Sequence, residues 1–376
     1  MSLLILSAAD VRQVVSSFDT NFLQDLMARV FTSISRAEVN STSGEASIQA
    51  PHRTAINMAS HTTLFMPARI PDPRSSLEGT SIKVVSVPRR QGDVRGLPAT
   101  TLVMNEDTGA VDAVVNAREL TALRNAAGSL LSTTLVGVNK PENIVLFGAG
   151  KQIESHINVF LRHFRSMKTC TIVNRTLNER ALDLYRSATE AFPRVTFHLI
   201  SQLETDSIRK AVQEANIIIC ATPSTSPLFP SSWVASGTHV VLVGSYTSVM
   251  QEVEEVLVKR AIPTAHPNAS KRIDQVLLVD SREACMKEAG DLIKAGIDQA
   301  SMLEVGELIL QKGGEGPTEM SSPSVESIPM DFAGPVTMFK SVGVGLQDVV
   351  MSKEVVSYAK NSVGTGTLIE HYDAAY

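Results

Sequence analysis

The stretch that decides the fold of this chain is Ile144-Val-Leu-Phe-Gly-Ala-Gly-Lys-Gln-Ile-Glu154. A short continuous apolar run ends at Gly148, and a helical pattern begins after Gly150. A strand, a glycine turn and a helix in this order predict a dinucleotide site. Gly148 permits the tight turn, and Gly150 lets the backbone approach a pyrophosphate at the helix N-terminus. The third glycine of G-x-G-x-x-G is replaced by Ile153, so an ordinary strand–helix turn of a non-nucleotide α/β fold is the alternative.

Strand and helix patterns alternate on the carboxyl side of this motif. Apolar, β-branched runs predict strands at 169–174, 195–200, 216–221, 239–244 and 275–280, and helical patterns cover 152–165, 177–191 and 203–214. Strands that alternate with helices are typical of βαβ units and a parallel sheet. We therefore expect an α/β fold with a Rossmann-type, doubly wound parallel sheet in the middle of the chain.

The flanking segments have a different character. Short runs rich in Thr, Val and Ile, separated by turn residues, lie between residues 52 and 116 and predict a β-rich region. An Ala- and Leu-rich helix follows at 117–135, residues 312–335 have the composition of a loop, and 349–360 has the pattern of a closing helix. We expect this closing segment to complete the β-rich domain, which would then be of the α+β type.

Composition limits the function classes. The chain has 376 residues, a net charge of -5 and 43 % hydrophobic residues, which suits two packed domains and leaves no broad basic surface for nucleic acid. No run approaches the ~18 apolar residues of a membrane span, and the N-terminus is typical of a first strand rather than a signal peptide. The scattered Cys170, Cys220 and Cys285 predict buried thiols and no metal site. A reducing, cytoplasmic location is the expectation.

The end of the second expected strand predicts the cofactor. NAD-binding domains carry an acid there that binds the ribose hydroxyls. This chain has Asn174-Arg175-Thr176 instead. The Arg175 guanidinium can pair with a 2′-phosphate, and the neighbouring side chains can hydrogen-bond it, so NADPH (NADP+) is favoured. The alternative is that Arg175 is a solvated loop charge.

Several motifs, taken together, resemble the ornithine cyclodeaminase/mu-crystallin family over nearly the whole chain. They are Pro51-His-Arg53, Met66-Pro-Ala, Leu120-Thr-Ala-Leu-Arg124, Asn174-Arg-Thr176, Val279-Asp-Ser-Arg, Lys287-Glu-Ala-Gly-Asp291, Glu304-Val-Gly-Glu307 and Phe339-Lys-Ser-Val-Gly-Val-Gly-Leu-Gln-Asp348. The resemblance implies a Rossmann domain, residues 131–321, inserted into a β-rich domain for substrate binding and dimerisation, residues 1–130 and 322–376. It also implies NAD(P)-dependent chemistry on an amino acid or its imine, and a homodimer.

The resemblance also carries over a substrate pocket with Arg53, Lys83 and Arg124, lined by Met66. The residue pattern also supports this pocket, because Lys83 interrupts a run that is otherwise typical of a buried strand, and Arg124 stands among Leu and Ala. A cation in an apolar setting needs an anionic partner, and a substrate carboxylate would be one. The alternatives are a Lys83 that reaches solvent and an Arg124 that pairs with a structural carboxylate.

The chain departs from the family pattern in three places. Tyr246 stands where the cyclodeaminases and alanine dehydrogenases have an aspartate, and a phenol with an ordinary pKa near ~10 is no base at neutral pH. Ketimine reductases of the family also lack that aspartate. Gly96–Thr101 lacks a His-Gln pair of many relatives, and Pro263–Ile273 is an extra stretch.

These observations predict an NADPH-dependent reductase of a C=N bond next to a carboxylate, as in a cyclic ketimine. The expected partner is a small imino acid substrate, and no nucleic-acid or membrane partner is expected. Arg53 and Arg124 would bind the carboxylate, and Lys83 and Tyr246 are the candidate catalytic residues. Cofactor-binding candidates beyond Gly148, Gly150 and the Asn174–Thr176 segment are Lys151, Gln152, Thr222, Gly244, Lys340 and Gly343. An L-amino-acid dehydrogenase or cyclodeaminase, and a non-catalytic protein that binds NADPH and a small ligand, are the alternatives.

Overall fold

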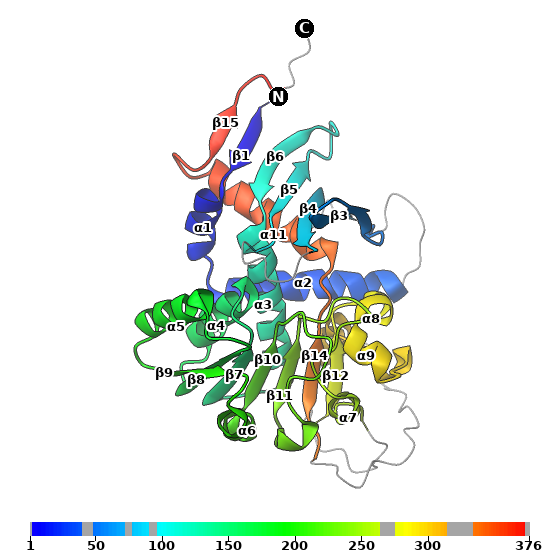
Figure 1. The fold of residues 1–376 in the computed structure, drawn as a ribbon. Helices are drawn as coiled ribbons and strands as arrows, with labels where there is room; N and C mark the ends of the chain where they lie inside the picture. The colour runs from blue at the N-terminus through cyan, green and yellow to red at the C-terminus, as the bar shows by residue number, and fades with distance from the viewer. Residues whose placement is uncertain are drawn as a thin grey trace. The chain divides into compact units, whose positions relative to one another are not determined.

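A computed structural model describes residues 2–39, 48–71, 77–89, 96–263, 275–313 and 334–372. The chain divides into two compact units (Figure 1). The first is formed by Met1–Arg124 and Gly343–Tyr376, and the second by Asn125–Val342. Helix α3 (Arg118–Leu135) begins in the first unit and ends in the second.

The first unit contains a mostly antiparallel sheet and three helices of its own among the described residues. Its elements are β1 (Leu3–Leu6), α1 (Ala8–Ser16), α2 (Thr20–Val39), β2 (Thr54–Asn57), β3 (His61–Ile70), β4 (Gly79–Pro88), β5 (Ala99–Met104), β6 (Val111–Asn116), α11 (Gly345–Lys360) and β15 (Thr367–Ile369). The strand order is β15-β1-β6-β5-β4-β3-β2, and β1 runs parallel to β6. Helix α11 packs against β3 and β4.

Alternation along the strands assigns side chains to two faces of this sheet. In β4 every second residue is buried, including Ser81, Lys83 and Val85, while the residues between them are partly exposed. In the register, Lys83 lies opposite Met66 of β3 and Thr101 of β5, which are also buried. Lys83 therefore belongs to the buried face, as period-two alternation requires.

The second unit contains a parallel sheet with helices on both faces. Its elements are β7 (Asn143–Phe147), α4 (Lys151–His163), β8 (Thr169–Asn174), α5 (Glu179–Ala191), β9 (Thr196–Ser201), α6 (Thr205–Glu214), β10 (Ile217–Cys220), η1 (Ser231–Trp233), β11 (His239–Leu242), α7 (Glu255–Lys259), β12 (Val276–Val279), α8 (Arg282–Glu288), α9 (Gly290–Lys294), η2 (Gln299–Ser301), β13 (Leu303–Glu304), α10 (Val305–Gly313) and β14 (Thr337–Lys340).

The strand order β13-β12-β14-β11-β10-β7-β8-β9 is that of a doubly wound sheet. The chain runs outward from β7 to β9 and then returns to β10 on the other side of β7, so α4 and α5 lie on one side of the sheet and α6 on the other (Figure 1). The carboxyl ends of β7 and β10 meet at the point where the direction of winding reverses, which is where such sheets bind ligands. The α/β fold with a Rossmann-type sheet is therefore confirmed.

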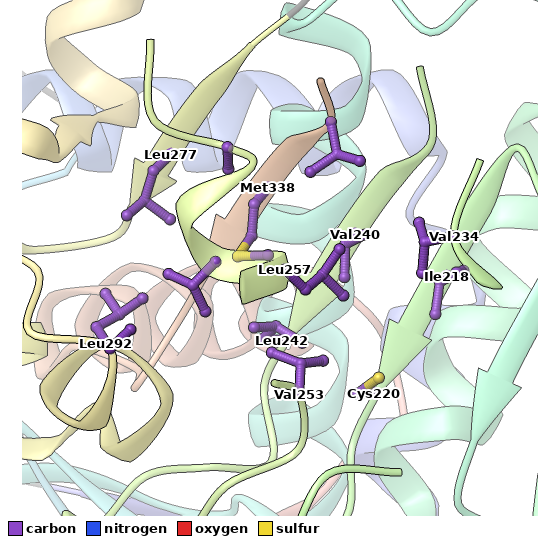
Figure 2. Close-up of a cluster of buried hydrophobic side chains, with 14 of the residues drawn as sticks. Ile218, Cys220, Val234, Val240, Leu242, Val253, Leu257, Leu277, Leu292 and Met338 are labelled. Atoms are coloured by element: carbon purple, nitrogen blue, oxygen red, sulfur yellow. The ribbon is translucent and has the colours of Figure 1, made fainter. Parts of the chain in front are cut away.

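The core of the second unit explains why these strands read as unbroken apolar runs. Ile218, Val240, Met338 and Leu277 lie in one row across β10, β11, β14 and β12, and all are fully buried (Figure 2). A strand that is covered on both faces carries apolar residues at successive positions, so apolar and polar residues do not alternate in its sequence. The cysteines are buried free thiols, as expected, and Cys220 belongs to this core (Figure 2).

Three boundaries differ between the structure and the sequence analysis. The first domain was expected to include residues 322–376, but β14 pairs in parallel with β11 and β12, so residues through Val342 belong to the second unit. That unit also begins at Asn125 rather than at residue 131. The closing helix begins at Gly345, four residues before the expected 349, and so includes Gln347 and Asp348.

None of the helices in the described segments combines the length and the apolar character that a membrane crossing requires.

Candidate active site

A buried ion cluster occupies the first unit. Lys83 on β4 is 1 % exposed, and its Nζ lies 2.7 Å from Oδ2 of Asp348. The other carboxylate oxygen of Asp348, Oδ1, lies 3.3 Å from Nε of Arg124, which is 3 % exposed. Asp348 stands in the first turn of α11, where the helix dipole favours a negative charge. A strand, a long helix and the closing helix thus each contribute one charge.

Two further residues fix the Arg124 guanidinium. Nη1 of Arg124 donates a hydrogen bond of 2.7 Å to Oε1 of Gln347. Gly343 has a φ of +81°, and a Cβ at this position would lie 2.5 Å from Nη1 of Arg124. Glycine is therefore required at 343 both by the backbone conformation and by the close approach of the guanidinium. Gly343, expected at the cofactor, packs against a substrate-pocket candidate.

The charges of neighbouring groups act on the Lys83 ammonium. Burial lowers the pKa of the Lys83 ammonium from 10.5 to about 8; the Asp348 carboxylate raises this pKa, and the charges of Arg124 and Arg53 lower it. Two guanidinium groups and one carboxylate thus act on the charge of Lys83. A buried lysine with this pKa holds its proton at neutral pH and can still release it.

The structure shows an anionic partner that the sequence analysis does not identify. Lys83 and Arg124 both contact Asp348. The pairing of Arg124 with a structural carboxylate, named as an alternative, is therefore present, and the binding of a substrate carboxylate stays a prediction. Lys83 does not reach solvent, because its side chain is enclosed. The sequence analysis gives Asp348 no role, and it expects the closing helix to begin only after this residue.

The remaining substrate candidates of the first unit lie near Lys83. Met66 is its register partner on β3, and the partly buried Arg53, just before β2, is close enough for its charge to act on Lys83. The Gly96–Thr101 segment ends on β5 with Thr101, the other register partner. Residues 264–273 of the extra stretch lie outside the described residues.

The glycine turn of the second unit has the geometry of a phosphate cradle. Gly148 has a φ of +116°, and a Cβ there would lie 3.0 Å from the carbonyl oxygen of Ala221. Gly150 is the N-cap of α4, and a Cβ there would meet no atom within 4 Å, which leaves the approach to the helix N-terminus open. Ile153 is fully buried. A third glycine is not needed, because this side chain packs in the core beneath the turn.

The other candidates of this turn are half-buried. Nζ of Lys151 lies 2.8 Å from Oε1 of Glu154, and the backbone oxygen of Gln152 accepts a hydrogen bond of 2.7 Å from Nδ1 of His156. The carbonyl can only accept, so Nδ1 carries the proton. Burial lowers the pKa of the His156 imidazole to about 4, which keeps it neutral.

The end of β8 lies beside the turn, because the backbone N–H of Gly148 donates to the carbonyl of Val173 at 2.8 Å. Nδ2 of Asn174 donates to the carbonyl of Thr176, which shapes a short turn, and Arg175 and Thr176 are exposed on it. The structure thus brings the Asn174–Thr176 segment next to the glycine turn, with the Arg175 side chain toward solvent.

Thr222 and Gly244, at the ends of β10 and β11, meet at a residue that sequence reasoning missed. The buried Glu252 accepts hydrogen bonds from both. It stands in the acidic run Gln251-Glu-Val-Glu-Glu255, which looks like a solvated surface and gave no signal. Lys340 is 0 % exposed and lies beneath, with its Nζ 3.6 Å from Oδ2 of Asp291. Tyr246 is half-buried on the loop after β11.

Comparison with known proteins places this fold. The ketimine reductase mu-crystallin of Mus musculus is 28 % identical over 315 residues, which are 83 % of this chain and 85 % of that protein. A Delta(1)-pyrroline-2-carboxylate reductase of Bacillus cereus is 27 % identical over 329 residues, 85 % of this chain and 89 % of that protein. The structure of Thermococcus litoralis Delta(1)-pyrroline-2-carboxylate reductase, in complex with NADH and L-proline, superposes with a TM-score of 0.75 at 21 % identity, over 97 % of this chain and 99 % of that one. The model of the ornithine cyclodeaminase/mu-crystallin family matches residues 8–305, and this chain belongs to that family.

Proposed function

We propose that this chain is an NADPH-dependent reductase of a C=N bond next to a carboxylate, as in a cyclic ketimine. The observation that carries the proposal is the group of cations that gathers at Lys83, which suits an anionic substrate and includes one cation that can give up a proton. The names of the relatives, a ketimine reductase and a pyrroline-2-carboxylate reductase, support the same reaction.

In the proposed reaction Arg53 and Arg124 bind the substrate carboxylate, because a guanidinium can donate two parallel hydrogen bonds to it. Lys83 donates its proton to the imine nitrogen and becomes neutral, so the total charge of the site does not change. The Asp348 carboxylate binds the Lys83 ammonium and keeps the pKa of this ammonium from falling below about 8. Water later returns the proton to Lys83.

The second unit fits a dinucleotide. Gly150 leaves the N-terminus of α4 open to a pyrophosphate, and the positive φ of Gly148 permits the turn that aims it. Arg175 is exposed beside this turn and would pair with a 2′-phosphate, while Thr222 would flank the nicotinamide. When bound, the reduced nicotinamide supplies the hydride that goes to the imine carbon.

The test is NADPH oxidation with Δ1-pyrroline-2-carboxylate, with a six-membered cyclic ketimine carboxylate, and with 1-pyrroline, which lacks the carboxylate. We expect turnover of at least one carboxylate and a loss of about 100-fold or more in kcat/KM for 1-pyrroline, because the two guanidinium groups would lose the substrate carboxylate that they are proposed to bind. Lys83→Met should lower kcat by roughly 10²–10⁴-fold. NADPH binding without turnover of any imine would favour a binding protein, and turnover only of a keto acid with ammonia would favour a dehydrogenase.

Tyr246 separates reduction from cyclodeamination. Conversion of L-ornithine to proline requires oxidation, ring closure and a second hydride transfer, and each step moves a proton. We propose that a phenol in place of the aspartate does not support this sequence, so that ornithine with NADP+ yields no proline above background. Efficient proline formation would contradict the reductase assignment.

We further propose that the chain forms a homodimer through the sheet of the first unit. The alternating positions that do not share the buried face of Lys83 carry partly exposed apolar side chains: Phe65, Ile82, Val84, Leu102 and Val114. A contiguous apolar sheet face of this kind is typical of an interface between copies.

A further inference from the structure

A buried carboxylate that the proposed reaction does not use ties two loops together. Glu252 is 0 % exposed. Its Oε1 accepts hydrogen bonds from the backbone N–H of Thr222 at 2.7 Å and from Oγ1 of Thr222 at 2.9 Å. Its Oε2 accepts from the backbone N–H groups of Gly244 at 2.9 Å and Ser245 at 3.2 Å. One side chain therefore receives four hydrogen bonds from two loops.

These two loops follow adjacent strands beside the glycine turn. Thr222 comes after β10 and Gly244 after β11, which pair in parallel. A Cβ at Gly244 would lie 2.2 Å from the carbonyl oxygen of Thr222 and 2.5 Å from Oε1 of Glu252. The loops are thus packed so closely that only glycine fits between them. The residue before Thr222, Ala221, contacts the Gly148 turn.

The groups around Glu252 shift the pKa of its carboxyl. The backbone N–H of Glu252 donates to Oδ1 of Asp291 at 2.7 Å, and Oδ2 of Asp291 faces Nζ of Lys340. Burial raises the pKa of the Glu252 carboxyl to about 7; Lys340 lowers it, Asp291 raises it, and the hydrogen bonds from Thr222 lower it. Cys220 on β10 is the other titratable group that feels both acids, and its raised pKa keeps it a thiol.

Protonation would change the hydrogen bonds in a definite way. On the Gly244 side both partners are N–H groups, which cannot accept a proton. The proton would therefore lie on Oε1, where the Thr222 hydroxyl can turn and accept it. Both loops would then be held by a neutral carboxyl, and hydrogen bonds to a charged acceptor are roughly twice as strong as neutral ones.

We propose that Glu252 is a positioning residue that holds the loops after β10 and β11 together as a carboxylate, and that proton uptake by this side chain loosens both loops. The consequence for the cofactor rests on the proposed function: if Thr222 and its loop flank the nicotinamide, NADPH affinity falls as the pH falls through about 7. Glu252→Gln removes the charge of the side chain: its amide N–H can donate to the Thr222 hydroxyl and its oxygen can accept from Gly244 and Ser245, but the hydrogen bond from the backbone N–H of Thr222 is lost.

The test measures amide hydrogen exchange of the cofactor-free full chain at pH 6 and pH 8, corrected for the intrinsic exchange rate. In the wild type, peptides covering 221–226 and 243–251 should exchange up to about tenfold faster at pH 6, since about 1.4 kcal/mol of lost hydrogen-bond energy corresponds to that factor. Glu252→Gln should exchange fast at both pH values. Equal wild-type protection at the two pH values would overturn the proposal, and this comparison decides even if the variant does not fold.

Glu304→Gln is the matched control. Glu304 is a buried acid on β13 whose Oε1 accepts from the backbone N–H of Arg282 at 2.9 Å, and β12 and β14 separate β13 from β11. Its loss should leave both peptides unchanged. NADPH affinity, measured by cofactor fluorescence over the same pH range, completes the test. Fast exchange at pH 6 in a wild type that binds no NADPH supports the loop proposal and contradicts the reductase. Tight NADPH binding, together with hydrogen exchange that is equal at pH 6 and pH 8, supports the reductase and contradicts the loop proposal.

Discussion

The substitution Asp348→Asn tests the ion cluster of the first unit most directly. It keeps the shape of the side chain and removes the carboxylate that lies 2.7 Å from Nζ of Lys83 and 3.3 Å from Nε of Arg124. Two buried cations then lose the carboxylate that they share. Lys83 can respond by releasing its proton, whereas the Arg124 guanidinium stays charged at any accessible pH.

The expected loss of unfolding free energy has two parts. In the wild type, a Lys83 pKa of about 8 instead of 10.5 already costs about 3.3 kcal/mol at pH 7. A Lys83 that is fully neutral in the variant would cost about 4.8 kcal/mol, so this part adds about 1.4 kcal/mol. The lost charged hydrogen-bond partner of Arg124 adds about 1.5–3 kcal/mol. The sum, about 3–4 kcal/mol, agrees with the usual cost of breaking a buried ion pair.

The pH dependence identifies the Lys83 part. Its folded pKa is lowered, so the stability penalty of its ammonium disappears as the pH rises through about 8 toward 10.5. At pH 9.5 Lys83 is neutral in both proteins, and the loss should shrink by about 1.4 kcal/mol. Urea unfolding at pH 7 and pH 9.5 measures this difference.

A matched control and a second measurement test whether the stability loss of Asp348→Asn comes from the ion cluster. Asp112→Asn removes a half-exposed acid of the same unit that lies 3.9 Å from Nζ of Lys360, and it should cost less than about 1 kcal/mol at both pH values. If turnover requires the Lys83 proton, the fall of kcat above pH 8 should also begin at lower pH in Asp348→Asn. An Asp348→Asn loss below about 1 kcal/mol, or one with no pH dependence, would refute the reasoning.

Three other predictions address the second unit and the assembly. Arg175→Asp should reverse a preference for NADPH over NADH, and a wild type that binds NADH at least as tightly would contradict the assignment of the second strand. Light scattering at micromolar concentration should give twice the mass of one chain, and Val84→Lys should give the mass of one chain; a monomeric wild type would exclude the dimer. Since the pKa of buried His156 is lowered to about 4, acidification from pH 7 to 5 should remove about 2 kcal/mol of stability through this group, and His156→Gln, but not exposed His198→Gln, should abolish that part in urea unfolding.

The parts of the fold that could be predicted are those encoded locally. The apolar run Ile144–Phe147 and the glycines after it determine a strand and a turn within a few residues, so the turn was found where it was expected. The closing helix was placed too late because Gly343 and Gly345 weaken the helical pattern, and its first turn is stabilised by burial against the sheet rather than by propensity.

The site could be predicted only in part, because its partners are distant in sequence. Lys83 and Arg124 were recognised as cations in apolar surroundings, but Asp348 lies 224 residues after Arg124, and no local pattern links the two. Glu252 stands in a run of acidic residues, and nothing in that run distinguishes it from its neighbours. The structure shows that Glu252 is buried between two loops. Burial of a charge is a tertiary property, and a single sequence shows which residues need a partner but not where the partner is.

Asp348 answers the question that the buried cations raise, and it still leaves room for a substrate carboxylate. Burial is the main cause of the lowered pKa of Lys83, and the charges of Arg124 and Arg53 lower this pKa further, against the effect of the Asp348 carboxylate. An anion that enters would raise this pKa and so charge Lys83 more completely as it binds. Above pH 8, the same carboxylate that brings the substrate in would thus increase the fraction of Lys83 that carries a proton.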